Sequence, residues 1–225
     1  MFSAAIFDMD GLLVDSERTI MKMWIAAGLD LGITLSPSDY LRIVGRSSTE
    51  CHEILTDLFG GATTFGEALI RVRQQLDAPA GQPTFPLKSG AHALLVELAR
   101  RGIPCAVASS SSVEDIKSRL ERVGVLHFFE AVAGGDEVAR EKPDPAVYRL
   151  AAHRLGESVH ACLAFEDSDH GARAAVSAGA AVVIVPDLKH PTREVVKLSF
   201  RVLGKLDEAI EHVSDWFRPR NVHCG

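Results

Sequence analysis

The chain has 225 residues, enough to bury a sizeable core in one large domain or in one domain with a smaller insert. Hydrophobic residues make up 47% of it and charged residues 24%, with only 18 Gly and 10 Pro, which argues against a disordered chain. The net charge is −6, so we do not expect nucleic acid as a partner, because phosphate backbones are bound by clustered Lys and Arg.

The cysteines and the N-terminal stretch indicate the cellular compartment in which the protein is expected. The four cysteines stand at positions 51, 105, 162 and 224, too far apart for a short zinc-binding spacing, and we expect free thiols. Asp8 and Asp10 interrupt the apolar N-terminus too early for a signal peptide, and the longest apolar run, Ala178 to Pro186, is too short to span a membrane. We therefore expect a cytoplasmic protein that does not associate with membranes.

Short apolar runs alternate with helical patterns along most of the chain. Continuous apolar runs are typical of strands that are buried on both faces of a parallel sheet. Helical spacing runs from Ala91 to Leu98, and again from Val147 to Leu155, where Asp144 is the predicted N-cap and Pro145 the first helical residue. These patterns predict an α/β fold with a doubly wound, Rossmann-like parallel sheet. The predicted strands are Ala4–Phe7, Ile103–Ala108, Phe128–Ala133, Cys162–Phe165 and Ala180–Val185.

One long segment contains no strand pattern. From about Ser16 to Phe85 the apolar spacing is helical, and Ser36-Pro37 and Ser48-Thr49 are typical helix starts. The stretch 77–86 carries three prolines and a glycine, which indicates a linker. We therefore predict a helical insert, the cap, over residues 16–85, with hinges near residues 14–17 and 78–88. Residues 1–15 and 86–225 form the predicted core domain.

Ligands of open parallel sheets gather at the carboxyl ends of the strands, and four segments of this kind carry polar residues. Asp8 and Asp10 stand two apart at the end of the first strand and can point to one side, and Gly11 then lets the chain turn. Taken alone, these acids could simply belong to a solvated loop. Ser109 begins a run of four serines that could bind an anion or only cap the next helix, for which Ser112 is the N-cap candidate.

Two further segments complete the pattern. Lys142 stands just before a predicted helix, in Lys142-Pro143-Asp144-Pro145, although a lone lysine is ordinarily a surface residue. The fourth predicted strand leads into Glu166, Asp167 and Asp169, whose charges repel one another unless a hard cation such as Mg²⁺ lies among them. Ser168 or Asp169 also caps the next helix. Together, the four segments predict a phosphoryl-transfer site.

In this order, the motifs A-A-I-F-D-M-D-G, A-S-S-S-S, K-P-D-P and F-E-D-S-D resemble the haloacid dehalogenase superfamily. The resemblance covers nearly the whole chain and is closest to members with a helical cap after the first motif, near the β-phosphoglucomutases and small phosphatases. It implies that Asp8 is the nucleophile, which becomes an aspartyl phosphate. It also implies that Asp10 first protonates the leaving oxygen and then activates water.

The same resemblance implies a Mg²⁺ cofactor. Asp8, the backbone carbonyl of Asp10, and Asp167 would hold the metal, and Glu166 would belong to the metal site as a partner of a metal-bound water rather than as a direct ligand. Donors around the transferring phosphoryl group stabilise its charge. The residues expected to bind substrate are Ser109, Ser110, Lys142 and Arg46.

Arg46 belongs to the expected cap. Its segment Val44-Gly45-Arg46-Ser47-Ser48 resembles a substrate-specificity loop, although an exposed loop arginine is an equally good interpretation.

The expected function is a Mg²⁺-dependent phosphatase acting on a small phosphorylated metabolite, a sugar or polyol phosphate, as a monomer or weak homodimer. A β-phosphoglucomutase-like mutase is the alternative, but Ile20 and Ser48 stand where those mutases carry a histidine and an arginine, which favours hydrolysis. A receiver-like signalling module also combines an acidic Mg²⁺ pocket with a phosphorylatable Asp and a Lys. In such a module the cap would be superfluous.

Overall fold

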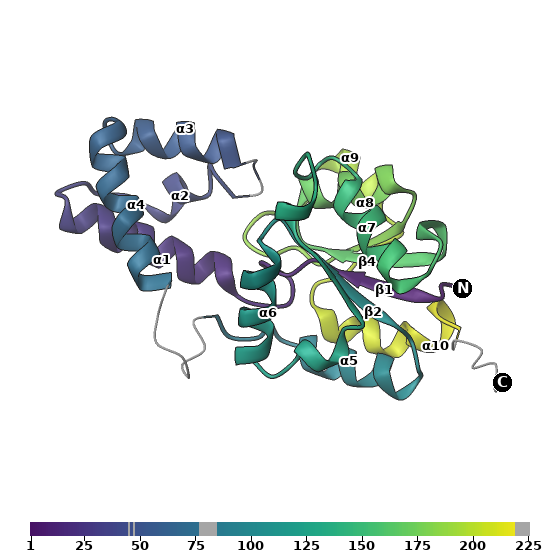
Figure 1. The fold of residues 1–225 in the computed structure, drawn as a ribbon. Helices are drawn as coiled ribbons and strands as arrows, with labels where there is room; N and C mark the ends of the chain where they lie inside the picture. Colours follow the sequence, from purple (N-terminus) through teal and green to yellow (C-terminus); the bar gives the residue numbers. More distant parts are fainter. Residues whose placement is uncertain (45, 47, 77–84, 219–225) are drawn as a thin grey trace.

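The computed structural model describes residues 1–44, 46, 48–76 and 85–218. Its strands form one parallel sheet in the order β3-β2-β1-β4-β5-β6 (Figure 1). The predicted doubly wound α/β fold is confirmed. The strands are β1 (Ala4–Phe7), β2 (Cys105–Ala108), β3 (Ala131–Ala133), β4 (Cys162–Glu166), β5 (Ala181–Ile184) and β6 (Arg201–Val202).

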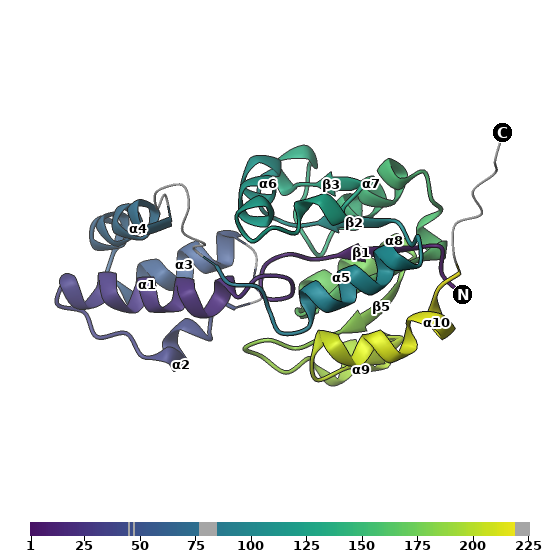
Figure 2. The same ribbon diagram turned by 90° about the horizontal axis from the view of Figure 1, so that it is seen from below.

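Helices cover both faces of this sheet, which is why the residues of β1 are all apolar and buried. Ala5 and Phe7 pack with α5, α6 and α10 on one face, and Ala4 and Ile6 pack with α7, α8 and α9 on the other, as the alternation of side chains along a strand requires. Figure 2 views the sheet with α5 in front of the strands. The core helices are α5 (Ala91–Arg100), α6 (Val113–Arg122), α7 (Ala146–Leu155), α8 (Asp169–Ala178), α9 (Arg193–Leu198) and α10 (Val213–Trp216).

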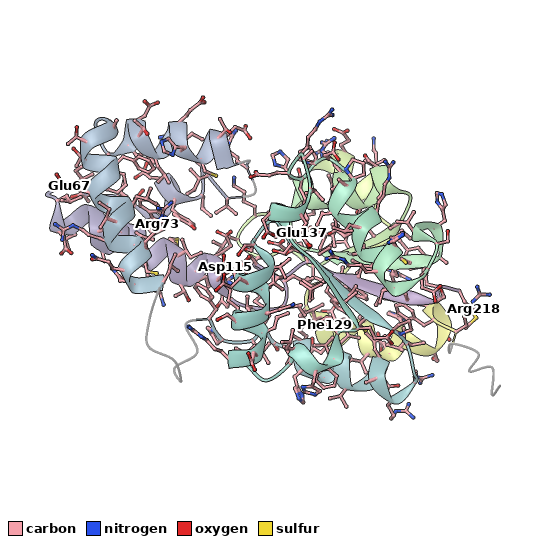
Figure 3. All side chains as sticks on the ribbon, viewed as in Figure 1. Glu67, Arg73, Asp115, Phe129, Glu137 and Arg218 are labelled. Atoms are coloured by element: carbon pink, nitrogen blue, oxygen red, sulfur yellow. The ribbon has the colours of Figure 1, made fainter. Side chains whose placement is uncertain are left out.

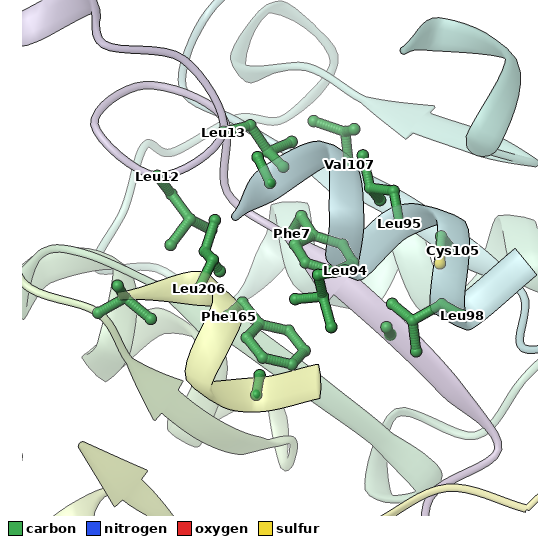
Figure 4. Packing of buried hydrophobic residues seen from close by; sticks show 14 of the residues in the cluster. Phe7, Leu12, Leu13, Leu94, Leu95, Leu98, Cys105, Val107, Phe165 and Leu206 are labelled. Atoms are coloured by element: carbon green, nitrogen blue, oxygen red, sulfur yellow. The ribbon is translucent and has the colours of Figure 1, made fainter. Parts of the chain in front are cut away.

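Aromatic packing aligns the ends of β1 and β4. Phe7 and Phe165 are register partners on these strands, and their rings stack with centroids 4.8 Å apart and an interplanar angle of 6° (Figure 4). Leu94 and Leu98 of α5 belong to the same buried cluster. The polar segments that follow Phe7 and Phe165 therefore start at one edge of the sheet.

The residues between β1 and α5 form helices with a core of their own. Among the described residues 16–76 there is no strand, as expected, and the cluster includes Trp24 stacked on Phe65, with ring centroids 5.9 Å apart. Figure 1 shows these helices beside the sheet, and Glu67 on α4 lies far from the core (Figure 3). Residues 77–84 of the predicted linker lie outside the described residues. The helices are α1 (Ser16–Asp30), α2 (Pro37–Tyr40), α3 (Ser48–Leu58) and α4 (Ala62–Leu76).

The chain enters and leaves this helical unit through two segments that lie side by side. Val14 forms an antiparallel bridge with Leu87. The amide of Asp15 donates to the Pro86 carbonyl at 2.8 Å, and the amide of Lys88 donates to the Leu13 carbonyl at 2.9 Å. These backbone bonds hold both connections at the edge of the sheet where β1 ends.

Several local expectations need correction. The predicted strand start at Phe128 is wrong, because a 3-10 helix occupies Leu126–Phe128. Pro145, not Asp144, is the N-cap of α7, although the Asp144 carboxylate accepts a bond from the Ala146 amide at 3.0 Å. The sequence pattern also missed β6, an exposed two-residue edge strand without an apolar run.

Other local expectations are confirmed. Ser112 and Ser168 cap α6 and α8 through their side chains, which accept bonds from the amides of Asp115 and Gly171. Within the described residues, no helix combines the length and the apolar character needed to cross a bilayer.

Candidate active site

Lys142 lies between two carboxylates at the ends of the adjacent strands β1 and β4. Its Nζ donates to Asp8 Oδ1 at 2.6 Å, to Glu166 Oε1 at 2.7 Å and to the Ala108 carbonyl at 3.0 Å. These three acceptors match the three protons of the ammonium group. Burial alone would lower the pKa of Lys142, but the two facing carboxylates outweigh it and raise that pKa. The lysine therefore carries its charge at the base of the site.

Glu166 is fully engaged with protein donors. Its Oε1 accepts from Lys142 and from the Tyr148 hydroxyl at 2.8 Å, and its Oε2 accepts from the amides of Asp167 and Ser168 and from the Ser168 hydroxyl. Burial alone would raise the pKa of Glu166, but Lys142, Tyr148 and the amides lower it. A Cβ at Gly171 would lie 1.6 Å from Glu166 Oε1, so only glycine fits there.

Asp8 and Asp167 face each other close to Glu166. One carboxylate oxygen from each of the three acids lies within 4.8 Å of the others. Burial raises the pKa of Asp8 well above its usual value, although the nearby Lys142 acts in the opposite direction. Burial and the neighbouring acids also raise the pKa of Asp167. Among the described residues, no cation or hydrogen-bond donor contacts the Asp167 carboxylate. A divalent cation fits this shortage of positive charge.

Gly11 makes room for this acidic group. It adopts a φ of 84°, and a Cβ there would lie 2.4 Å from Asp167 Oδ2. A side chain would therefore be strained by its backbone and would collide with the carboxylate. The turn that Gly11 allows directs the chain away from the sheet, toward Val14.

The carboxylate of Asp10 points to a different set of partners. Its Oδ2 accepts from the Ser111 hydroxyl at 2.9 Å, and its Oδ1 accepts from Arg119 Nη1 at 2.9 Å. Its side chain is therefore separate from the group formed by Asp8, Glu166 and Asp167. The two aspartates of the first motif share one cavity but have different electrostatic partners.

A cavity of about 300 Å³ opens above these residues. Both the core and the helical unit line it, so a ligand inside would contact both. Glu166 is fully buried beneath it and does not reach its surface. The sequence-predicted residues that line it are Asp8, Asp10, Arg46, Ser109, Ser110, Lys142 and Asp167.

The expected substrate-binding residues differ in their local contacts. Ser109 is 1% exposed, and its hydroxyl accepts a bond from the Ser111 amide at 3.1 Å, so it caps the turn as well as lining the cavity. Arg46 donates to the Arg42 carbonyl at 2.6 Å and to Glu50 at 2.9 Å. The two other loop residues, 45 and 47, lie outside the described residues.

Sequence reasoning missed Glu17 as a cavity residue. It lies on α1 and accepts a hydrogen bond from the Tyr40 hydroxyl at 3.1 Å. Burial and the nearby Asp10 raise the pKa of Glu17 to about 7. The sequence shows this acid only as part of a helix start, because nothing in the local pattern says that the first turn of α1 faces the site.

Arg119 and Tyr148 were also missed, and so was the bond that Ser111, a member of the predicted serine run, donates to Asp10. Arg119 stands seven residues after the N-cap Ser112, about two helical turns, so it lies on the same side of α6 as the start of the helix. That spacing could have placed Arg119 on the side of the helix that faces the site, but it does not identify Asp10 as its partner. The inward face of α7 carries Tyr148, whose hydroxyl is buried against Glu166, but its helical position alone predicts only a core residue.

Comparisons with known proteins extend this description. A family model described as haloacid dehalogenase-like hydrolase matches residues 2–179, a range that includes both Asp8 and Asp167. The chain is 32% identical over 188 residues to YhcW of Bacillus subtilis (strain 168), which is designated a phosphatase, with 83% of this chain and 84% of the relative covered. It is 29% identical over 184 residues to the fructose-1-phosphate phosphatase YqaB of Escherichia coli (strain K12), with 79% of this chain and 93% of that protein covered.

A solved structure shows the same architecture. The crystal structure of a haloacid dehalogenase family hydrolase from Deinococcus radiodurans R1, with bound phosphate and sodium, matches with a TM-score of 0.77 and 26% identity. The match covers 97% of this chain and 99% of that chain, so it includes both the sheet and the helical unit.

Proposed function

Because this chain belongs to the haloacid dehalogenase-like hydrolases, we propose that it is a Mg²⁺-dependent phosphatase that hydrolyses a sugar or polyol phosphate through an aspartyl phosphate on Asp8. The observation that carries the proposal is the pairing of Asp8 with Lys142, directly beside Asp167, at the base of a cavity that Asp10 also lines. In this proposal residues 1–15 and 86–225 are the catalytic core and residues 16–85 the cap.

The metal would be held by Asp8, Asp167 and the backbone carbonyl of Asp10. When bound, Mg²⁺ supplies positive charge that keeps the carboxylates ionised and neutralises the transferring phosphoryl group. Glu166 contributes from beneath, since its oxygens already accept bonds from Lys142, Tyr148 and the start of α8. Glu166 therefore fixes the positions of Lys142 and Asp167 and would not itself bind the metal directly.

In the first step, an oxygen of Asp8 forms a bond to phosphorus while the bond from phosphorus to the ester oxygen breaks. Asp10 gives a proton to that oxygen, and the product alcohol leaves. In the second step, Asp10 takes a proton from water, which attacks phosphorus and releases Asp8 and inorganic phosphate. Lys142 supplies positive charge beside the phosphoryl oxygens, and Ser109 and Ser110 would donate to them as their charge changes.

The class of substrate follows from the chemistry of Asp10 and from the relatives. An alkoxide leaving group needs a proton, which Asp10 can deliver, and the designation of the relative YqaB as a fructose-1-phosphate phosphatase supports a small phosphorylated sugar. Arg46 lines the cavity from the cap and would contact the polar leaving group. The mutase alternative is disfavoured by Ile20, an apolar residue in the cavity where those mutases carry a histidine.

Phosphate release from a panel of sugar, polyol and nucleotide monophosphates tests the proposal. Wild type is compared with Asp8→Asn, with Mg²⁺ or EDTA present, and Asp57→Asn on the exposed surface of α3 is the control. We expect release that needs both Mg²⁺ and Asp8. Isomerisation of a hexose phosphate without phosphate release would favour the mutase. The absence of any reaction in folded protein would contradict both the phosphatase and the mutase assignments.

A further inference from the structure

Arg119 is a cationic residue of the cavity that the proposed steps do not use. It lies on α6 between Ile116 and Leu120, both of which are fully buried in the core. Its side chain is 20% exposed, and that of its ion-pair partner Asp10 is 25% exposed, with Nη1 and Oδ1 2.9 Å apart. This ion pair is therefore partly shielded from water. Such shielding makes charge pairing stronger than it is on an open surface.

Two contacts fix the position of the guanidinium group. Its central carbon lies 5.0 Å from the ring centroid of Phe85, which is itself 4% exposed. Its Nη1 also donates to Asp10 at 2.9 Å. The aromatic ring and the carboxylate together hold the guanidinium group in place.

Asp10 is in turn held through both of its oxygens. Arg119 occupies Oδ1 and Ser111 occupies Oδ2, and these two donors come from α6 and the turn before it. Two bonds on different oxygens fix both the position and the rotation of a carboxyl group, which a single bond would not do. Ser111 and Arg119 are themselves 3.5 Å apart, so the three groups form one small network.

The two aspartates of the first motif pair with different cations. Lys142 pairs with Asp8 and Glu166, whereas Arg119 pairs with Asp10. In phosphoryl transfer the attacking and leaving oxygens lie roughly in line through phosphorus, so the leaving oxygen lies on the side away from Asp8. A proton donor on that side needs an orientation that does not depend on Lys142.

We infer that Arg119 is a positioning residue, which holds the Asp10 carboxyl group where the leaving oxygen departs and acts on the reaction only through Asp10. The inference rests on the proposed function. It concerns the proton that Asp10 gives to the ester oxygen while the bond between that oxygen and phosphorus breaks. A misplaced acid loses rate in that step, because proton transfer requires hydrogen-bond distance and alignment.

Substrates whose leaving groups differ in their need for a proton separate this role from phosphate binding. An alkyl phosphate such as glycerol phosphate releases an alkoxide, which needs the proton, whereas p-nitrophenyl phosphate releases a stable phenolate, which does not. The ratio kcat/KM covers the steps up to departure of the leaving group. We therefore expect Arg119→Ala to lower kcat/KM about 10- to 100-fold for the alkyl ester and by less than about threefold for the aryl ester.

Two further variants apply the same test from different sides of the network. Arg119→Lys keeps a charged donor and should recover part of the loss on the alkyl ester. Ser111→Ala removes the other bond to Asp10 and should show the same selectivity for alkyl over aryl esters, so the inference stays testable if Arg119→Ala folds poorly. Lys117→Ala, on the exposed face of the same helix, is the matched control and should leave both rates unchanged.

The outcomes are distinct. If wild type shows no release that depends on Asp8, the proposed function fails and the inference fails with it. If wild type is active but Arg119→Ala loses equally on both esters, Arg119 binds the phosphoryl group or supports the fold, and the inference alone is overturned. Unchanged rates on both esters would overturn it as well.

Discussion

At the scale of single residues, the base of the site depends on one lysine. Lys142 is the only cation, among the residues that the structure describes, within ion-pair distance of Asp8 and Glu166. Its side chain is 7% exposed, so water cannot replace it. Removing one partner from a buried ionic group leaves the other charges uncompensated. The folding free energy lost in this way is larger than the stabilisation that the complete group provides.

We therefore predict that Lys142→Ala loses at least about 99% of turnover, because a preorganised donor and the charge beside Asp8 are both lost. Phosphate release under saturating substrate measures this, with thermal unfolding recorded on the same sample to show that the variant is folded. The exposed Lys197→Ala serves as the control. Activity like that of wild type in Lys142→Ala would contradict the assignment of Lys142 to the site.

Glu17 carries a stability prediction of definite sign. Its pKa in the folded protein is about 7, above the ordinary value of 4.5, so the folded state binds the proton more tightly than the unfolded state. The resulting stability is present below the unfolded pKa and is lost as the pH rises through about 7. Wild type should therefore lose about 1–3 kcal/mol of unfolding free energy between about pH 5 and pH 8 from this group.

Glu17→Gln keeps an oxygen for the Tyr40 hydroxyl but does not ionise. Urea unfolding in EDTA at both ends of that pH range should show a flatter profile for Glu17→Gln than for wild type. Glu53→Gln, an exposed acid on α3, should follow wild type. If Glu17→Gln and wild type lose stability in parallel, Glu17 does not have the raised pKa described above.

At the scale of elements, Asp187 joins the core to both connections of the helical unit. It follows β5, and its Oδ1 accepts from Arg18 on α1 and from Lys88, just beyond the Val14–Leu87 bridge. Its side chain is 1% exposed, and its Oδ2 has no hydrogen-bond partner among the described residues. One buried carboxylate thus ties three segments that are distant in sequence.

We predict that Asp187→Asn lowers the unfolding free energy by about 2–4 kcal/mol, because two cations lose their shared partner in a shielded site. For a protein of this size, that corresponds to a decrease in Tm of about 4–16 °C. The exposed ion pair of Arg173 with Glu194 is the comparison, and Glu194→Gln should lower the unfolding free energy much less than Asp187→Asn. Equal effects of the two substitutions in thermal unfolding would contradict this account of Asp187.

At the scale of the whole molecule, metal binding should couple to folding. The acids of the proposed metal site come from segments more than 150 residues apart, Asp8 after β1 and Asp167 after β4, so the group exists only in the folded chain. A ligand that binds the folded state alone stabilises it in proportion to the logarithm of its concentration. The same acids destabilise the metal-free protein, since burial and the neighbouring carboxylates raise the pKa values of both Asp8 and Asp167.

Mg²⁺ at about one hundred times its Kd should therefore add about 2.7 kcal/mol to the unfolding free energy, and EDTA should remove this gain. Asp167→Asn should abolish the Mg²⁺-dependent shift in Tm while leaving the metal-free protein at least as stable as wild type, because one repelling charge is gone. Asp215→Asn, at an exposed position of α10, should retain the shift. A full shift in Asp167→Asn would remove Asp167 from the metal site.

The strands, the helix starts and the family could be predicted from residues close together in the chain. Apolar runs bounded by polar residues identified the buried strands from β1 to β5, and polar residues at helix starts identified the N-cap Ser112 and, with Asp169 as the alternative, the N-cap Ser168. The order of the four motifs identified the family, which is confirmed. Each of these signals is local, because a strand buried on both faces and a capped helix need particular residues at fixed spacing.

The pairing of charged side chains could not be predicted from the sequence, because it depends on how the helices and loops pack together. That Arg119 pairs with Asp10, that Asp187 receives Arg18 and Lys88, and that Glu17 faces the cavity depend on how helices and loops far apart in sequence are placed. Charged residues on a helix are usually solvated and do not follow the spacing of its apolar residues. Their positions in the sequence therefore do not reveal which residue each one pairs with. The sheet aligns the strand ends, and the packing of helices around that edge selects the partners of each charge.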